Sequence, residues 1–92
     1  MWYEWDDQKN QANLAKHGSA FEDVFAFRWD TALVVQDERM AYGETRWIAI
    51  GLLDNRLHIL IYTIRQEGVR VISLRKANDR ERRFHETQKS NT

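Results

Sequence analysis

The residues of this chain that are best suited to chemistry are a lysine, a histidine and two arginines at the expected ends of helices and strands. Lys16 and His17 stand directly before a glycine, and Arg65 and Arg75 close two apolar stretches. Such groups can cleave RNA without a metal, because the 2′-hydroxyl of the substrate supplies the nucleophile. His17 is the candidate proton carrier, since an unperturbed imidazole has a pKa of about 6.5. The hypothesis places Lys16 and His17 beside the scissile phosphate. It places Arg65 and Arg75 against the oxygens of this phosphate.

The C-terminal part of the chain is its basic part. Residues 56–92 carry a formal charge of +5 and residues 1–55 a charge of −5, although the whole chain is neutral. Ten of the fourteen basic residues are arginines, whose planar guanidinium suits phosphate oxygens and base edges. Ion pairing within a solvated face would explain the same residues equally well. The candidates for binding RNA are Arg46, Arg70, Arg82 and Arg83.

Metal and cofactor chemistry has little support in the sequence. The chain has no cysteine, and its three histidines lack the spacing of metal ligands. It contains neither a glycine-rich phosphate loop nor a Gly-x-Ser-x-Gly nucleophile motif. We therefore expect no metal and no cofactor. The lack of cysteine, of a secretory signal and of an apolar run of about 18 residues also predicts a cytoplasmic protein without a membrane segment.

The catalytic candidates of the first helix are expected at its junction with a second helix. Asp6 is a plausible N-cap of the first helix, and Gly18 is its expected left-handed terminator. Ser19 and Glu22 have the spacing of a capping box, which would begin the second helix. A third, charged helix is expected at the C-terminus. The helices are predicted over residues 6–18, 19–27 and 78–90.

Four short strands are expected between these helices. Connections such as Asp54-Asn55 are too short for a parallel crossover, so the strands must be antiparallel. The predicted fold class is α+β, a small antiparallel sheet of about four strands with two N-terminal helices and one C-terminal helix. All of it belongs to one domain, residues 1–92, of which residues 87–92 are expected to be frayed. The strands are predicted over residues 31–37, 44–54, 56–64 and 69–75, and residues 2–5 form either an edge strand or a packed arm.

Several short motifs together resemble the BrnT toxin family of bacterial and archaeal toxin–antitoxin systems. They follow one another from Trp2 to Glu86, which is nearly the whole chain. No single motif is enough to indicate the family, whereas the five motifs in this order are. The motifs are Glu4-Trp5-Asp6, Asn13-x-x-Lys16-His17-Gly18, Tyr42-Gly43-Glu44-x-Arg46, Tyr62-Thr63-x-Arg65 and Ile72-Ser73-x-Arg75-x-Ala77, the last followed by Glu81-Arg82.

The resemblance implies a RelE-like fold and an endoribonuclease that cleaves messenger RNA, inhibits translation and arrests growth. It also implies a BrnA-like antitoxin with a ribbon-helix-helix domain as partner, so that DNA is bound only through the toxin–antitoxin complex. The sequence departs from the family pattern at His85, where the final helix usually carries a tyrosine. An imidazole at this position could still donate a proton.

The candidate residues could also have purely structural roles. Lys16 and His17 in the last turn of a helix complement its dipole, at about 0.3–1 kcal/mol each. Glu44 and Arg46 share one strand face and could pair with each other, and Tyr62 is expected in the core. The alternative function is a non-catalytic module whose basic face binds RNA or a partner protein.

Overall fold

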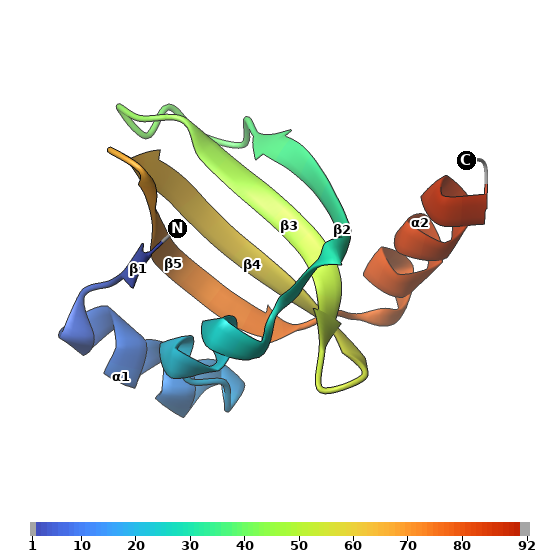
Figure 1. Cartoon of the computed structure of the whole chain (residues 1–92), viewed down its shortest axis with the longest axis horizontal. Coiled ribbons are helices and arrows are strands. Elements are labelled where there is room, and N and C mark those ends of the chain that lie inside the picture. The colour runs from blue at the N-terminus through green and yellow to red at the C-terminus, as the bar shows by residue number, and fades with distance from the viewer. Residues whose placement is uncertain (1, 91–92) are drawn as a thin grey trace.

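The fold is a single curved sheet with the two N-terminal helices together on one side of it and the C-terminal helix apart from them (Figure 1). In the computed structural model, which describes residues 2–90, five strands lie in the order β1-β5-β4-β3-β2. Strands β2 to β5 form an antiparallel meander, and β1 pairs in parallel with β5. No helix in this part of the chain is long and apolar enough to cross a membrane. The elements are β1 (Tyr3–Glu4), α1 (Asp7–His17), η1 (Phe21–Ala26), β2 (Arg28–Asp37), β3 (Arg46–Leu53), β4 (Arg56–Arg65), β5 (Gly68–Lys76) and α2 (Asp79–Ser90).

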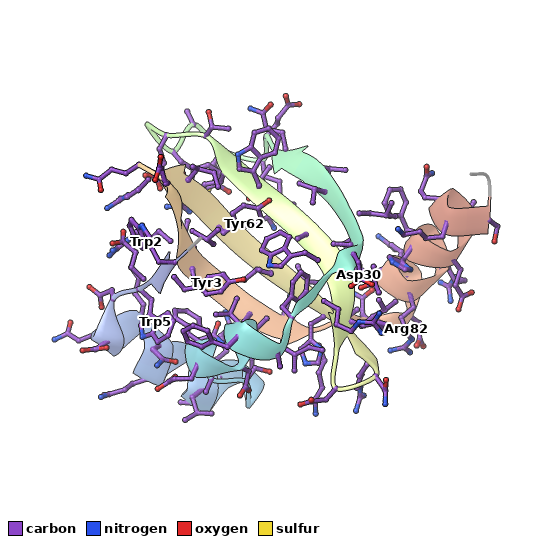
Figure 2. All side chains as sticks on the ribbon, viewed as in Figure 1. Trp2, Tyr3, Trp5, Asp30, Tyr62 and Arg82 are labelled. Carbon is purple, nitrogen blue, oxygen red and sulfur yellow. The ribbon has the colours of Figure 1, made fainter. Side chains whose placement is uncertain are left out.

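The α+β class is confirmed, but the sheet is mixed and has a fifth strand, because the N-terminal segment joins it. The backbone N–H of Val69 donates to the carbonyl oxygen of Trp2 at 2.8 Å. Gly68 allows the indole ring of Trp2 to lie directly against β5, since a Cβ at this position would stand 2.4 Å from the ring. Figure 2 shows Trp2 and Trp5 near this edge of the sheet and the ring of Tyr3 over its face, where the hydroxyl accepts from Nε1 of Trp29 at 2.7 Å.

The second N-terminal helix is the 3-10 segment η1 rather than an α-helix, and Ser19 does not cap it. Asn10 of α1 takes over the role expected of the capping box. Its side-chain oxygen accepts from the N–H of Phe21 at 2.8 Å, and its amide donates to Glu22 at 2.7 Å. Phe21 and Val24 are fully buried. Tertiary contacts with α1 and the sheet therefore determine this segment, in place of a local cap.

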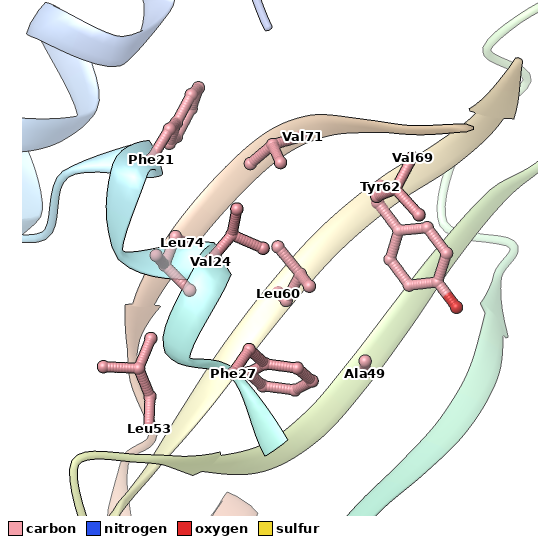
Figure 3. Close-up of a cluster of buried hydrophobic side chains, with 10 residues drawn as sticks. All are labelled: Phe21, Val24, Phe27, Ala49, Leu53, Leu60, Tyr62, Val69, Val71 and Leu74. Carbon is pink, nitrogen blue, oxygen red and sulfur yellow. The ribbon is translucent and has the colours of Figure 1, made fainter. Parts of the chain in front are cut away.

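The main core lies between one face of the sheet and η1 (Figure 3). Phe21 and Val24 of η1 pack with Leu60 of β4 and Leu74 of β5, and all four side chains have no exposed surface. Burial of such a side chain contributes about 1.5–3 kcal/mol, so this cluster is the main source of stability. Tyr62 belongs to the same cluster with 6% exposure, which confirms its predicted place in the core.

The opposite face of the sheet has a smaller apolar floor. Ile50 and Ile59 are buried there, and Ile48 and Ile61 are partly buried beside them. In the ladder, Ile48 pairs with Ile61 and Ile50 pairs with Ile59, so the four side chains form two adjacent rungs. We call these residues the isoleucine floor.

Helix α2 stands beyond β2, away from α1 (Figure 1), and it has no buried residue. It begins with a reciprocal capping box, in which Asn78 and Glu81 each accept the backbone N–H of the other at 2.9 Å. The helix extends to Ser90, and the fraying of the last residues stays a prediction. Residues 91 and 92 lie outside the described residues.

Candidate functional site

The last turn of α1 carries Lys16 and His17 and ends as the sequence predicts. Gly18 adopts a left-handed conformation with φ 73°, and its N–H donates to the carbonyl oxygen of Leu14. At the other end of the helix, Asp6 accepts the N–H of Lys9 at 3.0 Å. Both caps are local, and the helix dipole favours the two cationic residues at the C-terminal end.

Asn13 fixes this end of α1 to the sheet. It is 8% exposed, and its amide donates to the carbonyl oxygens of Leu74 at 2.7 Å and of Ser19 at 2.8 Å. Its side-chain oxygen accepts from the N–H of Leu74 at 3.3 Å and from the hydroxyl of Ser73 at 3.4 Å. Because Arg75 follows Leu74 in β5, these bonds bring the helix end towards Arg75.

His17 lies in the field of two cations. Partial desolvation lowers the pKa of His17 below its ordinary 6.5, and the charges of Lys16 and Arg75 lower it further. The imidazole is therefore mostly neutral at pH 7 and can accept a proton. The structure thus brings three of the four predicted catalytic residues into one group, which we call the helix-end cluster: Lys16, His17 and Arg75.

Arg75 is held in place by Glu81 of α2. Its Nη1 and Nη2 atoms donate to the two carboxylate oxygens at 2.8 and 2.7 Å, and its side chain is 30% exposed. The bond raises the pKa of Arg75 and lowers that of Glu81. Since Glu81 is also the capping residue of α2, the start of this helix positions the guanidinium.

Arg65 does not join the helix-end cluster, so the expected convergence of all four cations is wrong. Arg65 pairs with Gly68 in the ladder between β4 and β5, whereas Arg75 pairs with Ile59. These two rungs are six residue steps apart along β4, which corresponds to about 20 Å of extended strand. Arg65 instead donates to Glu44 at 3.3 Å.

A second group of charged residues lies at the same end of the sheet as Arg65. Glu44 accepts from Arg65 at 3.3 Å and from Arg46 at 3.4 Å, so the pairing that the sequence left open is present. The guanidinium carbon of Arg46 lies 4.0 Å from the centre of the Tyr42 ring, a cation–π contact. Arg46, a candidate for binding RNA, and Arg65, a candidate for catalysis, thus belong to one site.

Asp37 and Arg39 complete this second group, although no sequence motif marks them as functional. The side chain of Asp37 is fully buried and accepts from Nε and Nη2 of Arg39, both at 2.8 Å. The hydroxyl of Tyr42 also donates to Asp37 at 3.1 Å. The spacing of an aspartate and an arginine at a strand end is the only signal in the sequence, and it does not show that the carboxylate is buried. We call the group the loop cluster: Asp37, Arg39, Tyr42, Glu44, Arg46 and Arg65.

The other candidate arginines lie apart from both clusters. Arg70 pairs with Glu4 at 3.2 Å across the contact of β5 with β1. Arg82 pairs with Asp79 within α2. Arg83 is exposed and forms no ion pair with any residue in the range 2–90.

The histidines other than His17 bond to the main chain. Nδ1 of His58 lies 2.8 Å from the carbonyl oxygen of Arg56, and Nε2 of His85 lies 2.9 Å from that of Thr31. His85 thus links α2 to β2. Within residues 2–90, no three His, Asp or Glu side chains are grouped so that they could hold a metal ion.

Comparison with known proteins gives a family. The chain matches the family described as "Ribonuclease toxin, BrnT, of type II toxin-antitoxin system" over residues 5–81. The crystal structure of the Brucella abortus ribonuclease toxin BrnT is similar to it, with a TM-score of 0.69 and 31% sequence identity over 86% of this chain and 100% of that chain. No curated protein sequence matches significantly. The match along most of the chain, together with the shared fold, shows that the protein belongs to the BrnT family of ribonuclease toxins of type II toxin–antitoxin systems.

Proposed function

We propose that this chain is a metal-independent endoribonuclease that cleaves RNA at the helix-end cluster. The observation that carries the proposal is the position of His17 in the field of Lys16 and Arg75, where partial desolvation and these two charges lower the pKa of its imidazole. Membership of a ribonuclease toxin family supports the chemistry, and the cluster supplies a proton acceptor and cations for a phosphate. Cleavage of RNA in the cell would inhibit translation and growth.

In the proposed reaction, the imidazole of His17 takes the proton of a 2′-hydroxyl, whose oxygen attacks the adjacent phosphorus. The bond from phosphorus to the 5′-oxygen breaks, and the leaving oxygen takes a proton from the ammonium of Lys16. The products are a 2′,3′-cyclic phosphate and a 5′-hydroxyl. Arg75 donates to the non-bridging oxygens as their charge grows. Because Glu81 already fixes its guanidinium, Arg75 loses little freedom when the phosphate binds.

The proposed partner is a BrnA-like antitoxin with a ribbon-helix-helix domain. The family match supports an antitoxin, and the sequence resemblance supports its type. In this proposal both proteins act in the cytoplasm, and DNA is bound by the antitoxin of the complex.

Arg70, Arg82 and Arg83 are proposed as weaker contacts to the RNA backbone. Arg83 is exposed, whereas Arg70 and Arg82 are partly engaged with carboxylates of their own chain. These three arginines lie outside the two clusters, so each of them offers the RNA a single surface charge, and such contacts contribute little.

Incubation of the purified chain with RNA in EDTA tests the proposal. The wild type should cleave, and His17→Ala should lower kcat about 100-fold or more, because it removes the proton acceptor. Lys9→Ala is the matched control, since this exposed lysine lies on the same helix outside the cluster, and it should retain the wild-type rate. Salt-sensitive binding of RNA without any product would favour the non-catalytic module instead.

A further inference from the structure

The buried carboxylate of Asp37 holds an arginine that faces solvent. Burial of an ion is costly unless its oxygens are bonded, and Asp37 accepts from the N–H, Nε and Nη2 of Arg39 and from the hydroxyl of Tyr42. The bonds from Arg39 are the main cause that lowers the pKa of Asp37 to about 2. The side chain of Arg39 is nevertheless 61% exposed. Its guanidinium is thus fixed by one edge, and the exposed part of the side chain can reach another acceptor.

Arg46 and Arg65 are fixed in the same way beside it. Glu44 accepts from both, and the ring of Tyr42 lies against the guanidinium of Arg46. The loop cluster therefore sets three guanidiniums against two carboxylates, which leaves one positive charge and several free N–H groups. Arg65, with a half-exposed side chain, bonds Glu44 only through Nη2. Preorganised guanidiniums with free donors suit the oxygens of a phosphate.

The loop cluster and Arg75 are on the same face of the sheet. Alternate residues of a strand point to the same face of a sheet. Arg46 therefore shares the face of Ile48 on β3, and Arg65 shares the face of Ile61 on β4. Arg75 pairs with Ile59, so the isoleucine floor lies between the two arginine groups. The hydrogen bonds between Arg75 and Glu81 are the main cause of the pKa shift of each residue. The charge of Arg39 also lowers the pKa of both. The fields of the two clusters therefore meet over this face.

We propose that Arg39, Arg46 and Arg65 form a second phosphate-binding site, which holds the backbone of a single-stranded RNA several nucleotides from the scissile phosphate. The inference rests on the proposed function, because it takes the helix-end cluster as the place of cleavage. One strand of RNA can cross the isoleucine floor and reach both clusters. Cleavage should then become more efficient as the RNA grows long enough to reach Arg39. If the pairs only fix the loop between β2 and β3, RNA length will have no such effect.

The test compares kcat/KM on a dinucleotide with kcat/KM on an RNA of about 12 nucleotides. Arg39→Ala should lower kcat/KM about tenfold more on the longer RNA than on the dinucleotide. A factor of this size is expected for the loss of one charged contact to a phosphate. Arg65→Ala should act in the same direction, and it leaves the buried Asp37 with its partner. Thermal unfolding of each variant shows whether the fold persists.

Arg28→Ala is the matched control, because Arg28 lies on the same strand as Asp37 and pairs with Asp30 at 2.8 Å outside the loop cluster. It should keep the wild-type ratio between the two substrates. Equal losses on both RNAs, or no loss with Arg39→Ala and Arg65→Ala, would overturn the inference.

A binding measurement separates this inference from the proposed function. If the wild type cleaves neither RNA, the proposed function fails, but the second site is still decided by the affinity for a 2′-deoxy analogue that cannot be cleaved. Each arginine that binds phosphate should reduce the slope of log K against log salt by about one when it is replaced by alanine. Unchanged slopes for Arg39→Ala and Arg65→Ala would overturn the second site.

Discussion

Arg65 and Arg75 lie on one face of the sheet at opposite ends of the β4–β5 hairpin. Arg65 is opposite Gly68 and bonds Glu44, whereas Arg75 is opposite Ile59 and bonds Glu81. The two arginines both close apolar stretches in the sequence and look equivalent there. In the fold, each has its own carboxylate and its own neighbours, so they should contribute to function in different ways.

Double-mutant cycles should show this separation in the free energy of unfolding. Arg65→Ala and Arg75→Ala should add within about 0.5 kcal/mol, because distant residues without shared partners act independently. Arg75→Ala and Glu81→Ala should couple by about 1 kcal/mol, since their side chains bond directly and are partly buried. Urea unfolding of the single and double variants measures both cycles. Coupling between Arg65 and Arg75 as large as that of the bonded pair would contradict the arrangement.

His17 should titrate below pH 6.5, and the charge of Lys16 should be one of the reasons. Lys16→Gln removes that charge and should raise the pKa of His17, whereas Lys9→Gln, on the same helix, should not. NMR titration of the imidazole protons measures the pKa in each variant. Since the neutral imidazole is the proposed base, the cleavage rate should rise with pH through this pKa. A pKa at or above 6.5 in the wild type would count against the proposed role.

Asn13→Ala should destabilise the protein by about 3 kcal/mol, because it leaves buried backbone groups of Leu74 and Ser19 without partners. The loss should also reduce RNA cleavage, since the helix end that carries Lys16 and His17 is no longer fixed to β5. Gln11→Ala, at an exposed position of the same helix, should change the free energy of unfolding by no more than about 0.5 kcal/mol. A loss from Asn13→Ala no larger than that of Gln11→Ala would disprove the anchoring role.

The stability of the fold should fall in acid partly through Asp37. The bond with Arg39 lowers the pKa of Asp37 in the folded protein from 3.8 to about 2. Because the folded pKa is the lower one, this contribution is complete above the unfolded pKa and disappears as the pH falls through the folded pKa. Its size is up to about 2 kcal/mol. Asp37→Asn should flatten the pH dependence of urea unfolding between about pH 4 and pH 2, whereas Asp30→Asn, in an exposed pair, should leave it as in the wild type.

Features set by neighbouring residues can be predicted from this sequence. Asp6 and Gly18 cap α1 as expected, and the bonds between Asn78 and Glu81 begin α2. The reversal between β3 and β4 has positive φ at both Asp54 and Asn55, 52° and 63°, as a two-residue hairpin requires. Each of these features depends on a few adjacent residues and on backbone sterics. The α+β class follows from them together with short connections, which force antiparallel pairing.

Only the tertiary structure decides which distant residues meet. Ser19 has the right spacing for a cap, but Asn10 supplies the bond because α1 packs against η1. Asp37 is an ordinary strand-end aspartate until the sheet and the following loop bury it under Arg39 and Tyr42. Spacing along the chain records residue types, whereas distance in space depends on strand register, which adds about 3.3 Å per residue. The strand register places Arg75 near the end of α1, and it places Arg65 at the other end of the hairpin, where it pairs with Glu44.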